Sequence, residues 1–310
     1  MELFAILKKH FSYDAFRPLQ EAARRSDRRH LGVGPRAAVM KIVVGVVGLL
    51  ICARAATAEL HPIVTVEFGY FFGATANGKW IKAEDAAKSI PDETTYRIYG
   101  LTQPLGEVKG GKPKAVEDVC TDTLTVSLSS KPEKGVIALA APWNALPRKP
   151  QVIDPTQKVY VDAVSDFLKT RGIEQPQVKM ESILRVDLDG DGEEEVLISA
   201  TNYFRKDESV PMRSPAASYS MVLLRRVVAG KVETQLIVGE FYPKAYPKAK
   251  QEEGSFDAPN AYKVIATLDL DGDGKMEVVI HSDYYEGGET TIYRCDPKKA
   301  EALLSVACGA

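Results

Sequence analysis

Two near-identical stretches decide the predicted fold: VDLDGDGEEEVLISA, residues 186–200, and LDLDGDGKMEVVIHS, residues 268–282. Both match the pattern D-x-D-x-D-G-x-x-E, in which carboxylates stand at alternate positions of a short acidic loop. The segments on either side of each loop are short and rich in β-branched residues, a composition typical of strands. We therefore predict a strand, an acidic loop and a second strand in each stretch, and a protein that is mainly β.

The spacing of the acidic residues predicts one calcium site in each loop. Ca²⁺ takes about six to eight oxygen ligands, and carboxylates at alternate positions of a curled loop can converge on one point. Carboxylates held this close repel one another when no cation is bound. An acidic turn without metal is the alternative, and the duplication of the pattern argues against it. The predicted ligands, with Glu193 and Lys275 offering backbone carbonyls, are Asp187, Asp189, Asp191, Glu193 and Glu195, and then Asp269, Asp271, Asp273, Lys275 and Glu277.

The loops are not EF-hands, because position twelve is Ile198 or Ile280, where that motif has a bidentate Glu. The strand–DxDxDGxxE–strand unit resembles instead the calcium loops of FG-GAP or VCBS-type repeats, which are known from integrin-like β-propellers. The arrangement of residues 60–310 is similar to that of secreted bacterial proteins of unassigned function that carry such repeats. This resemblance implies structural calcium and propeller-like repeats, and it implies no established activity.

Each acidic loop is followed by two further strand-like runs, which gives four strands in meander order for each repeat. These runs are residues 219–224 and 235–238 in the first repeat, and residues 290–293 and 303–306 in the second. Four-stranded meanders are the units from which propellers are built. Since two such repeats do not close a propeller, we expect a propeller-like or sandwich arrangement of four-stranded repeats with one linking helix.

The sequence predicts two regions after residue 58: an N-terminal β-rich domain at residues 59–150 and a two-repeat calcium-loop β domain at residues 151–310. The second region begins with a helix over about residues 156–171, ended by a glycine. A Pro-rich linker is predicted at residues 142–155. The elements expected in the first region are strands at residues 63–72, 95–101, 124–128 and 136–139, and a short helix at residues 83–90.

The stretch MKIVVGVVGLLICARAATAEL, residues 40–60, has the layout of a secretory signal peptide. One Lys precedes ten apolar residues, and small residues end in Ala56-Thr57-Ala58, after which cleavage is expected. Ten apolar residues are too few to span a bilayer, and a buried core strand or helix is the alternative. We expect a signal peptide at residues 40–58, a non-native upstream extension at residues 1–39, a secreted or periplasmic location, and no stable membrane span after cleavage.

FSYDAFRPLQ, residues 11–20, resembles the N-terminal motif of RecQ helicases, which helps to hold the adenine of ATP. A helicase also needs a phosphate loop. GATANGKW, residues 73–80, fits GxxxxGK, but Trp80 stands where a hydroxyl must hold magnesium. The Asn77-Gly78 dipeptide indicates a tight turn between two strands. We interpret residues 11–20 as a passenger segment, which does not contribute to the function of the protein. A RecQ-like helicase fragment is the third-ranked function.

The charge distribution argues against a nucleic-acid partner. Residues 1–58 carry ten Lys and Arg against four Asp and Glu, and the remaining 252 residues carry 30 against 38. A surface that follows a phosphate backbone is basic, whereas this part of the chain is acidic. We therefore predict no binding to nucleic acid.

No GxSxG, HExxH or CxxC motif is present, and no catalytic residue is predicted. Beyond the signal only His61 and His281 remain. His61 is expected near a mobile end, next to the predicted cleavage site, and His281 is interpreted as a surface or sheet-edge histidine. The leading function is an exported calcium-binding protein with a binding or scaffolding role toward an extracytoplasmic protein or glycan. The alternative is an extracellular hydrolase of glycans or peptides that calcium stabilises, and the sequence favours the binding role over the enzymatic one.

Three cysteines lie beyond the predicted signal: Cys120, Cys295 and Cys308. An oxidising compartment allows a disulfide. Cys295 and Cys308 are close enough in sequence to pair, which would leave one thiol unpaired. Three free thiols are the other expectation.

Overall fold

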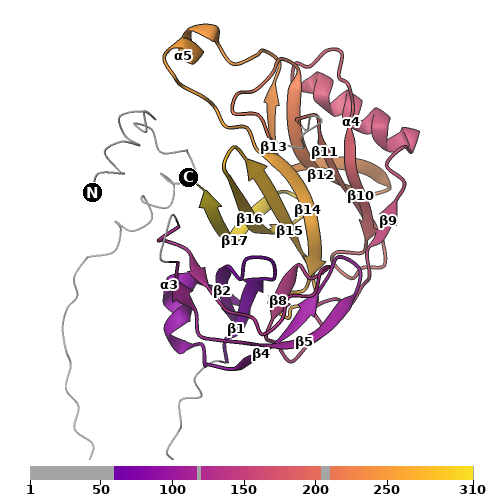
Figure 1. Ribbon diagram of the computed structural model, residues 1–310. Helices are drawn as coiled ribbons and strands as arrows, with labels where there is room; N and C mark the ends of the chain where they lie inside the picture. The colour runs from indigo at the N-terminus through magenta and orange to yellow at the C-terminus, as the bar shows by residue number, and fades with distance from the viewer. Residues whose placement is uncertain (1–58, 117–119, 204–209, 310) are drawn as a thin grey trace, which may run out of the picture. The chain divides into compact units, whose positions relative to one another are not determined.

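The computed structural model describes residues 59–116, 120–203 and 210–309 (Figure 1). The predicted signal peptide, the upstream extension and the helicase-like stretch at residues 11–20 lie outside the described residues. The fold is that of one compact unit, residues 58–248 and 256–310. The short helix α5 (Lys248–Glu252) belongs largely to the segment 249–255, which is not part of this unit.

The unit is built from antiparallel sheets, none of them closed, so the prediction of a mainly β protein is confirmed (Figure 1). The first sheet has the order β3-β2-β1-β8-β4-β5, the second β13-β12-β11-β10-β9 and the third β14-β15-β16-β17. The strands of the first sheet are β1 (His61–Thr65), β2 (Phe71–Ala76), β3 (Lys79–Lys82), β4 (Thr94–Tyr99), β5 (Pro104–Gly110) and β8 (Ile137–Leu139). Those of the second are β9 (Gln151–Ile153), β10 (Met180–Val186), β11 (Glu195–Thr201), β12 (Ser218–Val228) and β13 (Lys231–Tyr242). Those of the third are β14 (Ala261–Leu268), β15 (Glu277–Tyr284), β16 (Gly287–Cys295) and β17 (Ala300–Gly309).

The two four-strand meanders predicted around the acidic loops are present. β10 to β13 and β14 to β17 each follow one another in both sequence and space. The strands before and after each loop pair directly, with Val186 opposite Glu195 and Leu268 opposite Glu277. Each acidic loop is therefore the connection of a β-hairpin, and its two ends are held by ladder hydrogen bonds.

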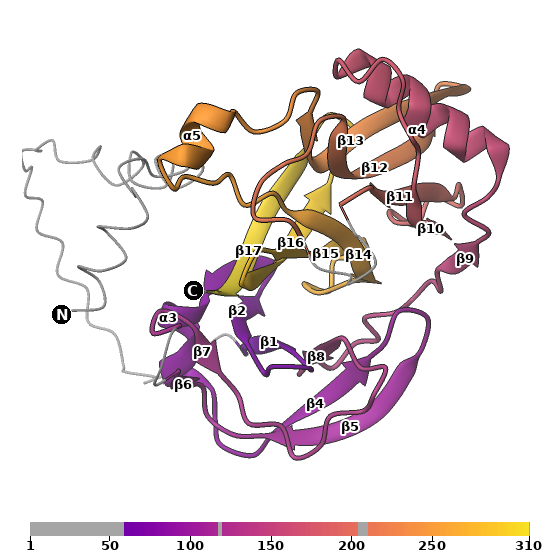
Figure 2. The same ribbon diagram turned by 45° about the horizontal axis from the view of Figure 1, so that its top comes forward.

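All three sheets contribute to one hydrophobic core. Successive residues of a strand face opposite sides, and in the second sheet Leu184 and Leu197 enter this shared core while Ile183 and Ile198 face the other way. That other face is covered by α4 (Lys158–Thr170), which lies across the sheet in both ribbon views (Figures 1 and 2). Because both faces are buried, the strands read as continuous apolar runs.

The helix predicted at residues 156–171 is confirmed as α4. Val164 and Leu168 on its inner side are fully buried, and Gly172 ends it at a φ of 83°. The predicted short helix at residues 83–90 is present as α3 (Ala83–Ala86) followed by a 3₁₀ turn (Ala87–Ser89).

The strand predicted at residues 63–72 is divided into β1 and β2. Gly69 lies between them at a φ of 75°, and a Cβ there would come within 2.4 Å of the carbonyl oxygen of Val126. Only glycine permits this turn and this close approach. The strand predicted at residues 124–128 is reduced to β7 (Leu124–Thr125), paired with β6 (Lys114–Ala115), and β5 was not predicted.

The hairpin predicted for residues 73–80 is confirmed. β2 and β3 pair on either side of Asn77 and Gly78, with Ala76 opposite Lys79. A phosphate loop leads into a helix, whereas this segment leads into an edge strand.

The prediction of a linker at residues 142–155 is wrong. Residues 151–153 form β9 and pair with β10, and the residues before them contact both acidic loops. Prolines are frequent in linkers, but they also occur in extended segments held by side-chain contacts, and composition alone does not separate the two cases. The predicted division at residues 150 and 151 stays a prediction.

The disulfide joins Cys120 to Cys308, and among the described cysteines Cys295 is the free thiol. The pairing of Cys295 with Cys308 and the alternative of three free thiols are therefore both wrong. Both Cys295 and Cys308 lie in the neighbouring antiparallel strands β16 and β17, but Cys295 is opposite Ala300 and Cys308 is opposite Gly288. The register places the two sulfurs at opposite ends of the hairpin.

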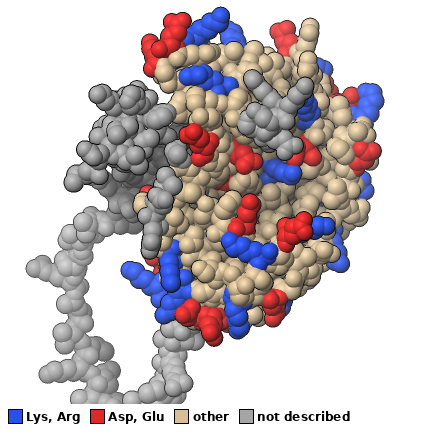
Figure 3. Space-filling view, in the orientation of Figure 1, with Lys and Arg blue, Asp and Glu red and all other residues tan. Residues whose placement is uncertain are grey.

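Among the described residues, no helix has the length and apolar character needed to cross a membrane. On the face drawn in Figure 3, basic and acidic side chains are interspersed.

Candidate metal centres

The two acidic loops occupy equivalent positions in their sheets. Residues 187–194 connect β10 to β11, and residues 269–276 connect β14 to β15. Each loop has two glycines at positive φ, 83° and 91° in the first loop and 78° and 87° in the second. These glycines allow the chain to curl so tightly that alternate side chains point inward.

The same five hydrogen bonds shape both loops. The first Asp of each loop accepts from both glycine amides: Asp187 from Gly190 and Gly192 at 2.6 and 3.2 Å, and Asp269 from Gly272 and Gly274 at 2.8 and 3.1 Å. The second and third Asp each accept from the amide two residues further on. The Glu at position nine accepts from the amide of the buried leucine at position two, Leu188 or Leu270.

The structure brings together most of the predicted ligands. Carboxylate oxygens of Asp187, Asp189 and Glu195 lie within 4.8 Å of one another, as do those of Asp269, Asp271 and Asp273. Asp191 is not in the first cluster and Glu277 is not in the second, although both belong to the same loops. The amides of Glu193 and Lys275 bind Asp191 and Asp273, and their carbonyls stay predicted ligands.

The second loop lies deeper in the protein than the first. Asp269 and Asp271 are buried whereas Asp189 is exposed. Burial, followed by the neighbouring carboxylates, raises the pKa of both Asp269 and Asp271 above the ordinary value. Burial also raises the pKa of Glu277, to about 8, and raises that of Glu195. Each loop thus holds negative charge that the protein does not fully compensate.

An arginine faces the position-nine glutamate in each sheet. The register of β11 with β12 places Arg226 beside Glu195, and that of β15 with β16 places Arg294 beside Glu277. The guanidinium of Arg294 donates to Asp271 at 3.0 Å, and the indole of Trp80 donates to the same carboxylate oxygen at 3.2 Å. Arg226 reaches the carbonyl of Cys295 instead. The two loops therefore differ in their fixed counter-charge.

Residues 143–148, here called the brace, lie against both loops. The indole of Trp143 donates to the carbonyl of Asp269 at 2.8 Å, and its ring covers Gly272, where an added Cβ would meet it at 3.1 Å. At the other end of the brace, Arg148 covers Gly190 of the first loop in the same way. The brace thus fixes the equivalent glycine of both loops.

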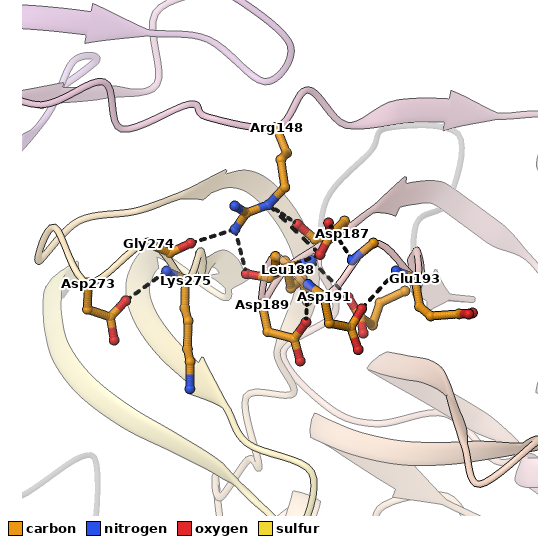
Figure 4. A network of polar contacts seen from close by, with 12 residues as sticks. Arg148, Asp187, Leu188, Asp189, Asp191, Glu193, Asp273, Gly274 and Lys275 are labelled. Atoms are coloured by element: carbon orange, nitrogen blue, oxygen red, sulfur yellow. Dashed lines mark hydrogen bonds and ion pairs between the residues drawn. The ribbon is translucent and has the colours of Figure 1, made fainter.

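The Arg148 guanidinium joins the loops to each other (Figure 4). It donates to the carbonyls of Asp187 at 2.5 Å and Leu188 at 3.0 Å in the first loop, and to that of Gly274 at 2.7 Å in the second. The amide of Met276 also donates to the carbonyl of Leu188 at 2.7 Å. The two candidate centres are therefore neighbours that share hydrogen bonds.

A cavity of about 20 Å³ lies between the loops, which is room for one water molecule. Its lining includes Asp189, Glu195 and Glu277 together with Arg226. Arg226 is only 8% exposed, and its Nε has no hydrogen-bond partner among the described residues. Buried donors of this kind are satisfied in proteins by water or by a ligand oxygen.

Sequence reasoning missed the residues around the loops: Trp80, Trp143, Arg148, Arg226 and Arg294. For two of them a signal existed, because an arginine directly follows the third strand-like run of each meander, at residues 225–226 and 294. The brace had no such signal in the sequence, because it occurs once and is not part of the repeated meander. His61, expected near a mobile end, lies in β1 with its ring edge-on to Trp143 at 4.6 Å. His281 contacts Thr290 and Asp283 on the third sheet.

The donor set fits a hard divalent cation. The second cluster offers three carboxylates from alternate positions of its loop, and the first offers two such carboxylates together with that of Glu195 at position nine. Hard oxygen donors are what Ca²⁺ and Mg²⁺ prefer. The ion pair of Arg294 with Asp271 shows that the second loop already attracts a positive charge.

We expect the calcium-free protein to lose stability as pH rises from about 5 to 8. In that window folded Glu277, with its pKa near 8, keeps a proton that the unfolded chain, with the ordinary value of 4.5, has released. The stabilising contribution of the Glu277 proton is fully present below the unfolded pKa and is gone once the pH has passed the folded pKa. Between these two pKa values the free energy of unfolding falls by up to about 1.4 kcal/mol per pH unit. Urea unfolding in EDTA at several pH values measures it. The neutral Glu277→Gln variant should show a shallower slope, and an unchanged slope would contradict this assignment.

Comparisons with known proteins add no relative. No family model matches the chain, and neither the curated proteins nor the solved structures gave a significant match.

Proposed function

We propose that this chain is an exported protein in which two calcium ions hold the acidic loops, and that it acts as a binding or scaffolding protein outside the cytoplasm. The observation that carries the proposal is the pair of carboxylate clusters, built by the same five hydrogen bonds at equivalent hairpins. One such cluster is a common surface feature, but two clusters in loops shaped by the same five hydrogen bonds favour a selected ligand site.

The residues divide the work between binding and positioning. Asp187, Asp189 and Glu195 would hold the first ion, and Asp269, Asp271 and Asp273 the second. When bound, each ion supplies positive charge that neutralises the converging carboxylates. The brace and the position-nine glutamates hold the loop backbone and so fix where the carboxylates meet; Glu195 has both roles, because it also belongs to the first cluster.

Two further features support the location and the architecture in this proposal. The disulfide between Cys120 and Cys308 is of a kind that persists in oxidising compartments, which agrees with an export signal at residues 40–58. The consecutive four-strand meanders agree with FG-GAP-like repeats in a propeller-like arrangement, in which the third sheet lies between the other two. A partner would be an extracytoplasmic protein or glycan.

Isothermal titration calorimetry of the full chain with calcium chloride tests the proposal. We expect two bound ions per chain, and a loss of one in each of the variants Asp189→Asn and Asp273→Asn. Both substitutions keep an oxygen that can accept from the loop amide, and they replace the other carboxylate oxygen with an NH2 group that carries no charge and cannot bind a cation. No uptake of calcium at millimolar concentration would overturn the proposal.

A further inference from the structure

We propose that the two metal loops do not bind calcium independently: Arg148 couples them, so that filling one loop strengthens binding at the other. This inference rests on the proposed calcium function. It assigns to Arg148 a positioning role at both sites, through a side chain that belongs to neither loop.

The geometry of Arg148 carries the inference. One guanidinium group donates to three backbone carbonyls, at Asp187, Leu188 and Gly274, and these belong to the two different loops (Figure 4). The planar, rigid fork of arginine makes this possible, since a single ammonium group has no such arrangement of donors. A displacement of either loop backbone must therefore move or break a bond to the other.

A second connection runs beside the first. The amide of Met276 binds the carbonyl of Leu188, so that carbonyl receives one bond from the second loop and one from Arg148. Next to it lies the small cavity whose lining includes ligands of the first loop and Glu277 of the second. Arg226 also lines this cavity, and its buried Nε has no partner among the described residues, which is consistent with a water or ligand oxygen near the loops.

The expected sign of the coupling follows from loop order. Repelling carboxylates loosen a calcium-free loop, and a bound ion orders it. An ordered first loop holds Arg148, and Arg148 then holds the backbone of the second loop, so the second ion meets a smaller entropic cost. The opposing effect is electrostatic, because the first ion reduces the negative potential at the second loop. That effect does not need the arginine bridge, and screening by salt weakens it.

The fluorescence of the two tryptophans of the chain can be used to follow the second loop separately from the first. Trp80 contacts Asp271 and Trp143 contacts the carbonyl of Asp269, and there are no others in the sequence. Tryptophan emission during a calcium titration therefore reports the second loop, while calorimetry reports both.

The experiment is a double-mutant cycle on the full chain, titrated with calcium chloride. Asp189→Asn changes a ligand of the first loop and no residue of the second. We nevertheless expect it to shift the emission midpoint of the second loop about five-fold or more toward higher calcium, through the coupling. In the Arg148→Met background the same substitution should shift the midpoint less than about two-fold. By reciprocity Asp273→Asn should weaken the first loop in calorimetry, again only when Arg148 is present.

Two controls separate the bridge from charge. Arg148→Lys keeps the charge and should behave like Arg148→Met, whereas Lys149→Met removes the exposed neighbouring charge and should leave the coupling intact. If Asp189→Asn leaves the emission midpoint unchanged in the native background, the inference is wrong even when both loops bind calcium. A shift that persists in both Arg148 variants also overturns it. Absence of any calcium signal in the native chain would instead refute the proposed function.

Discussion

Replacing Cys120 and Cys308 with alanine is expected to lower the free energy of unfolding by about 4 to 5 kcal/mol. The two cysteines are 188 residues apart, so the disulfide closes most of the described chain into one loop. In the chain-entropy description a cross-link of this span removes more freedom from the unfolded state than any short-range bridge does. It also anchors the last strand, β17, to the first region, where Thr123 already donates to the carbonyl of Ala307 at 2.8 Å.

Urea unfolding with and without a reducing agent measures this contribution. The native protein should lose stability on reduction, and the Cys120→Ala/Cys308→Ala variant should be insensitive to the reductant. Cys295→Ala is the matched control, because burial raises the pKa of the Cys295 thiol to about 12 and keeps it unreactive. That control should retain the full response to the reductant. Equal midpoints for the oxidised and reduced native protein would show that the bridge contributes nothing.

Saturating calcium is expected to raise the melting temperature by roughly 10 to 20 °C relative to EDTA. A site filled at about 100 times its dissociation constant adds about 2.7 kcal/mol, and two sites add about twice that. For a chain of this size each kcal/mol corresponds to about 2 to 4 °C. Magnesium should give a smaller shift, since it is smaller, requires octahedral geometry and keeps its waters.

The loop variants Asp187→Asn and Asp269→Asn should each remove about half of the calcium-induced shift, and the double variant should remove nearly all of it. Asp162→Asn is the control, because Asp162 is exposed on α4, away from both acidic loops in the sequence, and forms an ion pair with Lys158 at 2.6 Å. It should alter the melting temperature in EDTA slightly and leave the calcium shift unchanged. A native protein that melts at the same temperature in both buffers would mean that the acidic loops are plain turns.

The elements that sequence reasoning predicted well are those whose signal is local. The hairpin at Asn77-Gly78 follows from the turn residues, and α4 follows from the spacing of Val164 and Leu168 and from Gly172. The strands beside the acidic loops follow from short aliphatic runs bounded by turn residues. β5 was missed because its sequence, PLGEVKG, contains the turn formers proline and glycine and has few strand formers.

The candidate ligands could also be predicted from sequence, because their spacing in a curled loop sets their convergence. Where the prediction differs from the structure, long-range contacts decide. Glu277 is outside the second cluster although its spacing matches that of Glu195, which is in the first. The two loops have different surroundings, and Arg294 and Trp80 hold the carboxylate of Asp271.

The sequence by itself determined a mainly β protein with two acidic hairpin loops and their candidate ligands, because turn chemistry and residue spacing act within a few positions. Only the tertiary structure decided that Cys120 pairs with Cys308, and that residues 143–148 brace both loops. It also decided that Arg148 joins one candidate metal centre to the other. These contacts join residues from about 40 to almost 190 positions apart, and their partners are set by how three sheets pack around a common core, which no local pattern encodes.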